Sequence, residues 1–92
     1  MTMPVHAPLG SDVEIDTRVR ALITRFGRLD VDVKTLSDDD RLSEAGMTSH
    51  ASVDLMLALE DVFGEIPESM LTRSTFESIG AIKTAMRSLI AA

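Results

Sequence analysis

Residues 42–67 have the sequence LSEAGMTSHASVDLMLALEDVFGEIP, which contains the most regular pattern in the chain. Apolar residues recur every three or four positions, and this spacing predicts an amphipathic helix over residues 49–63. At 1.5 Å per residue the helix would be about 22 Å long. Gly46 predicts a turn before the helix, and Pro67 blocks its simple continuation. The apolar face consists of Val53, Met56, Leu57, Leu59, Val62 and Phe63.

Ser49, at the start of this helix, is the candidate functional residue. In this position we expect it to be the N-cap, a contact worth about 1 kcal/mol. A nucleophilic serine would need a general base and an oxyanion hole, but the chain has only His6 and His50 and no Gly-x-Ser-x-Gly motif. A phosphodiester on Ser49 would lie at a helix N-terminus, where backbone amides and the helix dipole favour phosphate. The position suits covalent attachment better than catalysis, and we expect no enzymatic activity.

Two further helices are predicted, one on each side of this stretch. Ser11-Asp-Val-Glu14 has the form of a capping box and begins the first helix, which Gly27 is expected to end in a left-handed conformation. Ser78 is expected to cap a last helix that runs through Leu89, with Gly80 allowing close packing. The apolar stripes are Ile15, Val19, Leu22, Ile23 and Phe26 in the first helix, and Ile79, Ile82, Met86, Leu89 and Ile90 in the last.

The long connection over residues 28–48 is expected to be an extended loop laid over the core. Within it, Ser37 is expected to cap a short turn that directs Leu42 inward. A loop this long without structure of its own is unusual, and its length points to a function or to local order.

The remaining connection contains two candidate short turns. Pro67 can open one of them, and Ser74 or Thr75 can start another that holds Phe76. The predicted fold class is therefore all-α, a small four-helix bundle with three main helices, one or two short ones and a long first loop. We expect residues 1–10 to form a flexible N-terminal tail and residues 11–92 to form one domain.

Composition and charge exclude several functions for this chain of 92 residues. There is no cysteine, so any thiol chemistry must use a sulfur supplied from outside. Residues 30–68 hold eleven acidic and two basic residues, which disfavours nucleic acid and favours basic protein partners. Asp38, Asp39 and Asp40 do not have calcium-loop spacing, and no metal site is predicted. We find no signal peptide or membrane-spanning run and expect a cytoplasmic monomer.

The pattern Leu42-x3-Gly46-x2-Ser49-x3-Val53-x-Leu55-x3-Leu59-Glu60-x2-Phe63-x2-Ile66-Pro67 resembles the phosphopantetheine-binding carrier proteins. Those proteins are four-helix bundles with a serine at the start of the second helix, after a long first loop. The resemblance implies that residues 11–92 are a carrier domain. It also implies that Ser49 receives 4′-phosphopantetheine from coenzyme A through a phosphopantetheinyl transferase.

The triplet Thr48-Ser49-His50 departs from the Asp-Ser-Leu of most carriers and indicates a specialised subgroup. Two further segments, Ser49-x-Ala51-Ser52-Val53-x-Leu55-Met56-Leu57 and Leu71-x-Arg73-x2-Phe76-x-Ser78-Ile79-x-Ala81-Ile82, are similar to the small aminoacyl carrier proteins. In that family a seryl-tRNA-synthetase-like ligase uses ATP to load an amino acid onto the arm as a thioester. The alternatives are an acyl or peptidyl carrier of a lipid, polyketide or nonribosomal pathway, and an unmodified acidic helical adaptor.

Six residues around the serine and along the second helix are candidate partner contacts. Three of them flank the arm and three are acidic, which suits basic partner surfaces. Core packing is an equal alternative for Met47, and simple solvation is an equal alternative for the acidic residues. The candidates are Met47, His50, Ser52, Asp54, Glu60 and Asp61, whereas Leu55, Leu59, Phe63 and Ile82 are assigned to the core.

Overall fold

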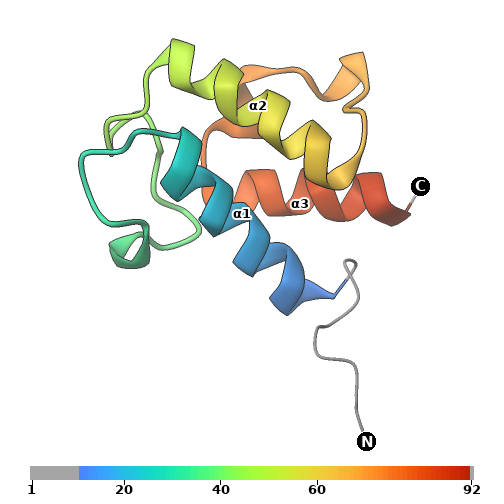
Figure 1. The fold of residues 1–92 in the computed structure, drawn as a ribbon, viewed down its shortest axis with the longest axis horizontal. Helices are drawn as coiled ribbons and strands as arrows, with labels where there is room; N and C mark the ends of the chain where they lie inside the picture. The colour runs from blue at the N-terminus through green and yellow to red at the C-terminus, as the bar shows by residue number, and fades with distance from the viewer. Residues whose placement is uncertain (1–10, 92) are drawn as a thin grey trace, which may run out of the picture.

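The computed structural model describes residues 11–91, which form three α-helices and three short 3-10 helices (Figure 1). In chain order the elements are α1 (Asp12–Phe26), η1 (Val33–Thr35), α2 (Ser49–Phe63), η2 (Glu68–Met70), η3 (Arg73–Phe76) and α3 (Ile79–Ala91). Within residues 11–91 there is no β-strand, only an isolated bridge between Arg41 and Ser78. The predicted all-α class is confirmed. The predicted tail, residues 1–10, lies outside the described residues.

The first helix begins as predicted and ends differently. The Ser11 hydroxyl accepts a hydrogen bond from the Glu14 amide at 3.1 Å. The prediction that Gly27 is left-handed is wrong, because its φ of −74° is right-handed helical and its amide still donates to the Ile23 carbonyl at 2.8 Å. The chain reverses one residue later, at Arg28, whose φ is 52°. Gly27 is nevertheless well suited to its place, since a Cβ there would lie 2.7 Å from the Ile23 carbonyl oxygen.

The long connection after α1 is more ordered than an extended loop. It contains η1, where the Asp32 carboxylate accepts a hydrogen bond from the Lys34 amide at 2.9 Å. Further along, the Asp40 carboxylate accepts from the Ser37 amide at 2.9 Å, so the turn is closed by Asp40 and not by the Ser37 side chain. Leu42 is fully buried, as predicted. Two aspartates therefore supply part of the local order that the loop's length suggested.

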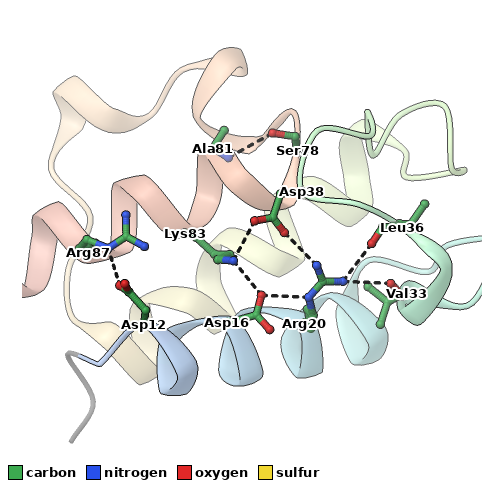
Figure 2. Close-up of polar contacts among 10 residues, drawn as sticks. All are labelled: Asp12, Asp16, Arg20, Val33, Leu36, Asp38, Ser78, Ala81, Lys83 and Arg87. Atoms are coloured by element: carbon green, nitrogen blue, oxygen red, sulfur yellow. Dashed lines mark hydrogen bonds and ion pairs between the residues drawn. The ribbon is translucent and has the colours of Figure 1, made fainter.

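The segment between α2 and α3 contains two short helices. Pro67 precedes η2, as predicted. The next one, η3, begins at Arg73, one residue before the earlier of the two predicted starts, Ser74 and Thr75. Its cap is the Thr72 side chain. The Ser78 hydroxyl accepts from the Ala81 amide at 3.1 Å and begins α3 as expected (Figure 2). With η1, the described chain has one more short helix than the sequence predicted.

The core lies where the three α-helices meet, and α1 packs against both α2 and α3 (Figure 1). The four core residues predicted from α2 and α3 are buried, with Phe63 8% exposed and the other three fully enclosed. The predicted apolar face of α2 was too wide, because Val53 and Leu57 are each 51% exposed. The fully enclosed large side chains are Ile15, Val19, Ile23, Leu42, Leu55, Leu59, Ile79, Ile82 and Met86. Among the described residues, no helix is both long and apolar enough to span a bilayer.

A polar cluster joins α1, the long loop and α3 (Figure 2). The Lys83 ammonium donates to Asp16 at 2.8 Å and to Asp38 at 2.9 Å. The Arg20 guanidinium donates to both of these aspartates and to the backbone carbonyls of Val33 and Leu36. The Gly80 amide also donates to the Asp38 carbonyl at 2.9 Å, where a Cβ would be 3.1 Å from that oxygen. This confirms the predicted close packing at Gly80 and fixes the path of the loop that leads to α2.

Stability is expected to depend on pH through this cluster. The hydrogen bond from Lys83 lowers the pKa of Asp16 below 3.8, and the same contact raises the pKa of Lys83 above 10.5. The stabilisation that Asp16 contributes is thus complete above pH 3.8 and is lost as the pH falls through the folded-state pKa of Asp16. The stabilisation that Lys83 contributes is complete below pH 10.5 and is lost as the pH rises through the folded-state pKa of Lys83. Lys83→Met should therefore unfold at a lower temperature than the wild type at neutral pH. This gap in unfolding temperature should narrow in strong acid and in strong base.

Thermal unfolding followed by circular dichroism across pH measures this gap. Arg87→Met is the matched control, because it removes the Arg87–Asp12 pair, in which Asp12 is 77% exposed. Exposed pairs contribute about 0–1 kcal/mol, so the control should stay close to the wild type throughout. A gap for Lys83→Met that is constant from acid to neutral pH would contradict the assigned charge contacts.

Candidate functional site

A tight turn sets the start of α2. Gly46 has a φ of 108°, and a Cβ on it would lie 2.5 Å from the Asp30 carboxylate and 2.9 Å from the Asp30 amide nitrogen. The Asp30 amide donates to the Ala45 carbonyl and the Met47 amide donates to the Leu42 carbonyl, each at 2.9 Å. Both the backbone conformation and the close approach thus require glycine. The turn predicted at Gly46 is confirmed, and it directs the chain into α2.

Ser49 is the first residue of α2 and not its cap. The N-cap is Thr48, whose hydroxyl accepts a hydrogen bond from the Ala51 amide at 3.1 Å. The prediction that Ser49 caps the helix is therefore wrong, and the cap energy belongs to its neighbour. The Ser49 side chain is exposed and forms no side-chain hydrogen bond with any residue in the range 11–91. Its hydroxyl is available for chemistry without loss of a structural contact.

A groove of about 380 Å³ opens beside Ser49, between the start of α2 and the η3 segment. Its lining combines hydroxyl groups, an aromatic ring and charged side chains from three separate segments. Arg41 comes from the long loop and Arg73 from η3, so two arginines line the groove that contains the serine. The lining also includes Ser49, Ser52, Phe76 and Glu77.

His50 and Asp54 lie one turn apart on α2 next to Ser49. The His50 side chain is 77% exposed, and its Nε2 is 3.8 Å from Asp54 Oδ2. The same carboxylate oxygen accepts a hydrogen bond from Arg28 at 2.7 Å. His50 is not hydrogen-bonded to Ser49 in the described structure, so the pair does not have the geometry of a serine and its general base. Of these two predicted partner contacts, His50 is open, whereas the charge of Asp54 is already paired within the chain.

The other four candidate contacts differ in how exposed they are. Met47 is 9% exposed and packs in the core, which is the alternative that the sequence left open. The Glu60 carboxylate accepts a hydrogen bond from the Ile66 amide at 3.0 Å and so holds the chain after α2. Asp61 is exposed, and Ser52 lines the groove. Partner binding stays a prediction for all six residues, and His50, Ser52 and Asp61 are the best placed for it.

Comparison with known proteins agrees with this geometry. Residues 18–85 match the protein family described as a phosphopantetheine attachment site. An aminoacyl carrier protein of Agrobacterium fabrum is 36% identical over 77 residues, which are 83% of this chain and 93% of that protein. The chain belongs to the phosphopantetheine-binding carrier protein family. The resemblance predicted from the sequence is confirmed, including its similarity to aminoacyl carrier proteins.

Solved structures share the fold of this carrier protein. One matching chain comes from the crystal structure of an engineered Bradyrhizobium japonicum glycine:[carrier protein] ligase complexed with a carrier protein from Agrobacterium tumefaciens and ATP. It has a TM-score of 0.76 and 37% identity, over 80% of this chain and 97% of that chain. A solution structure of a protein from Agrobacterium tumefaciens has a TM-score of 0.64 and 36% identity, over 83% of this chain and 93% of that one.

The residues near Ser49 fit the cofactor of the carrier family, a covalent 4′-phosphopantetheine arm. The serine hydroxyl is exposed, and the groove beside it can take the first part of an arm. Arg41 and Arg73 can neutralise a phosphodiester in a part of the chain that is otherwise acidic. The cofactor also supplies the thiol that this cysteine-free chain lacks.

Sequence reasoning missed three residues of this site. Thr48 could have been found, because a threonine directly before the predicted helix is as good a cap candidate as the serine after it. Arg41 belongs to no motif, and Arg73 occurs only in the segment similar to aminoacyl carrier proteins, so nothing in the sequence placed the two together beside Ser49. Only the folded arrangement of the long loop, α2 and η3 brings both arginines to the same groove as the serine.

Proposed function

We propose that Ser49 bears the 4′-phosphopantetheine arm and that the protein holds an activated amino acid on it as a thioester. The observation that carries this proposal is the free, exposed hydroxyl of Ser49 at the first position of α2. It is supported by the 36% identity to an aminoacyl carrier protein, which extends over 93% of that protein.

The chain itself supplies attachment and presentation, and we propose that it is not an enzyme. Ser49 provides the oxygen atom of the phosphodiester, and Thr48 holds the first turn of the helix in place through the Ala51 amide. The helix N-terminus and the two arginines of the groove favour an anion there. When bound, the cofactor supplies a thiol on a flexible arm that can carry a thioester.

Two enzymes would act on this site. A phosphopantetheinyl transferase would add the arm from coenzyme A, and an ATP-dependent, seryl-tRNA-synthetase-like amino acid:carrier protein ligase would load it. The solved complex of a glycine:[carrier protein] ligase with an Agrobacterium carrier protein supports a partner of the second kind. His50, Ser52 and Asp61 are proposed as contacts at the start and along the outer side of α2. We also propose that the protein acts in the cytoplasm, where coenzyme A and ATP are available.

Mass spectrometry tests the attachment directly. The unmodified protein is incubated with coenzyme A and a phosphopantetheinyl transferase, and the intact mass should rise by one arm. Trypsin should then release residues 42–73 as one peptide, because there is no lysine or arginine between Arg41 and Arg73. Fragmentation of this peptide should place the arm on Ser49. An arm on another residue would contradict the assignment, and no gain with several transferases would favour the unmodified adaptor.

A loading assay tests the amino acid. The protein with its arm is incubated with the ligase, ATP and single amino acids, and an adduct that hydroxylamine removes is expected. Loading by fatty-acid enzymes without any amino acid adduct would instead favour an acyl carrier.

A further inference from the structure

We infer that Arg41 and Arg73 bind the phosphodiester of the arm and direct the arm into the groove between α2 and η3. This inference rests on the proposed attachment at Ser49 and adds a resting position for the arm. Both arginines border the groove that contains the serine, and both side chains are exposed. A guanidinium group matches the oxygen geometry of a phosphate, and two of them can contact one phosphodiester from opposite sides.

Within residues 11–91, three arginines form no ion pair, and only two of them, Arg41 and Arg73, line the groove, whereas Arg25 lies over the Phe26 ring. Arg41 and Arg73 form no ion pair and no side-chain hydrogen bond with any residue between 11 and 91, although the chain is rich in carboxylates. Glu77 also lines the groove, so the charged groups there sum to one net positive charge. A positive site in an acidic protein is the expected feature of an anion-binding groove. The arginines paired elsewhere are Arg18 with Glu14, Arg20 with Asp16 and Asp38, Arg28 with Asp54, and Arg87 with Asp12.

The backbone holds the two arginines in place from different sides. Arg41 pairs with Ser78 in the isolated bridge, and the next amide, that of Leu42, donates to the Glu77 carbonyl at 2.9 Å. Arg73 is the first residue of η3, which the Thr72 side chain caps. The long loop and the end of η3 are thus joined next to the groove, and these contacts fix the backbone from which the Arg41 and Arg73 side chains extend.

The groove continues away from Ser49 into an apolar hollow of about 180 Å³. The two share Ser52 and Phe76, so an arm that leaves the serine can pass from the polar part to the apolar part. Val53 and Leu71 line the hollow and are 51% and 43% exposed, which leaves apolar surface uncovered. The methyl and methylene groups of the pantetheine portion would cover this surface and gain from its burial.

A spin label on the arm tests this resting position. Because the chain has no cysteine, the thiol of the arm is the only thiol and takes one nitroxide selectively. In the ¹⁵N-labelled protein, the amide signals of residues 71–76 and of Val53 should broaden strongly, whereas those near Arg18 on α1 should not. In the double variant Arg41→Gln with Arg73→Gln, most of the broadening at residues 71–76 should be lost.

The phosphorus-31 signal of the unlabelled arm gives a second readout. It should shift on addition of salt in the wild type, because screening weakens the arginine contacts, and it should already be shifted in the double variant. The matched control is Arg25→Gln with Lys34→Gln, which removes the same charge from positions that do not line the groove. The control should behave like the wild type in both measurements.

Two results would overturn the inference. One is weak broadening spread evenly over the wild-type protein, and the other is equal broadening and an equal phosphorus signal in the wild type and the double variant. Failure of the proposed attachment looks different, since the protein would then have no thiol to label. Should the double variant not fold, the amide broadening and the phosphorus signal of each single variant are compared with those of the wild type. The salt titration of the wild type then tests the arginine contacts without any substitution.

Discussion

Ser49→Ala is expected to abolish addition of the arm and to leave the stability of the fold nearly unchanged. The loss is complete because this substitution removes the only oxygen atom that the proposed attachment uses. The stability is preserved because the Ser49 side chain makes no hydrogen bond within the described chain, and Thr48 provides the cap of α2. Alanine is also a better helix former than serine. Intact mass after treatment with coenzyme A and a transferase, together with urea unfolding followed by circular dichroism, measures both effects.

Two neighbouring variants separate attachment from helix capping. Thr48→Ala should lose about 1 kcal/mol of unfolding free energy, since it deletes the bond to the Ala51 amide. Ser52→Ala removes a hydroxyl that lines the same groove and should still gain one arm. Gain of an arm by Ser49→Ala would refute the site. A loss of about 1 kcal/mol in Ser49→Ala, with none in Thr48→Ala, would refute the capping geometry.

The elements that the sequence predicted well are those set by local contacts. The boundaries of α2 agree with the prediction because a turn glycine, a run of helical spacing and Pro67 all lie within a few residues of the helix. The caps at Ser11 and Ser78 are equally local, since each hydroxyl bonds an amide three residues away. Periodicity also identified the buried residues of α1 and α3, where one stripe faces the core.

The features that the sequence did not predict depend on contacts between distant segments. On α2, spacing alone gave an apolar face that included Val53 and Leu57, but α1 and α3 cover only part of it. Arg41 and Arg73 meet beside Ser49 only after the long loop and η3 have packed. The helix position and the family resemblance made Ser49 the candidate attachment residue, whereas the surroundings of the serine required the three-dimensional structure.

The long loop shows how such distant contacts position the site. Asp38 receives hydrogen bonds from Arg20 of α1 and from Lys83 of α3, so the middle of the loop is fixed to both helices. Leu42 is buried in the core, and the turn at Gly46 follows immediately. The loop therefore leads to Ser49 along a defined path, although little of it has regular secondary structure.

Leu59→Ala is expected to destabilise the protein more than any of the substitutions at Thr48, Ser49, Ser52 and Lys83. Leu59 is fully enclosed in the core, and truncation of a buried leucine to alanine costs about 2–5 kcal/mol. Domains of this kind are stable by only about 5–15 kcal/mol, so the variant would lose a large share of its stability or unfold. Leu57→Ala is the matched control, because Leu57 lies two positions earlier on α2 and is 51% exposed. Since exposed substitutions usually change stability by about 0.5 kcal/mol or less, the control should unfold at nearly the wild-type urea concentration. Equal losses in the two variants would contradict the orientation of α2, and with it the outward position of the groove that borders Ser49.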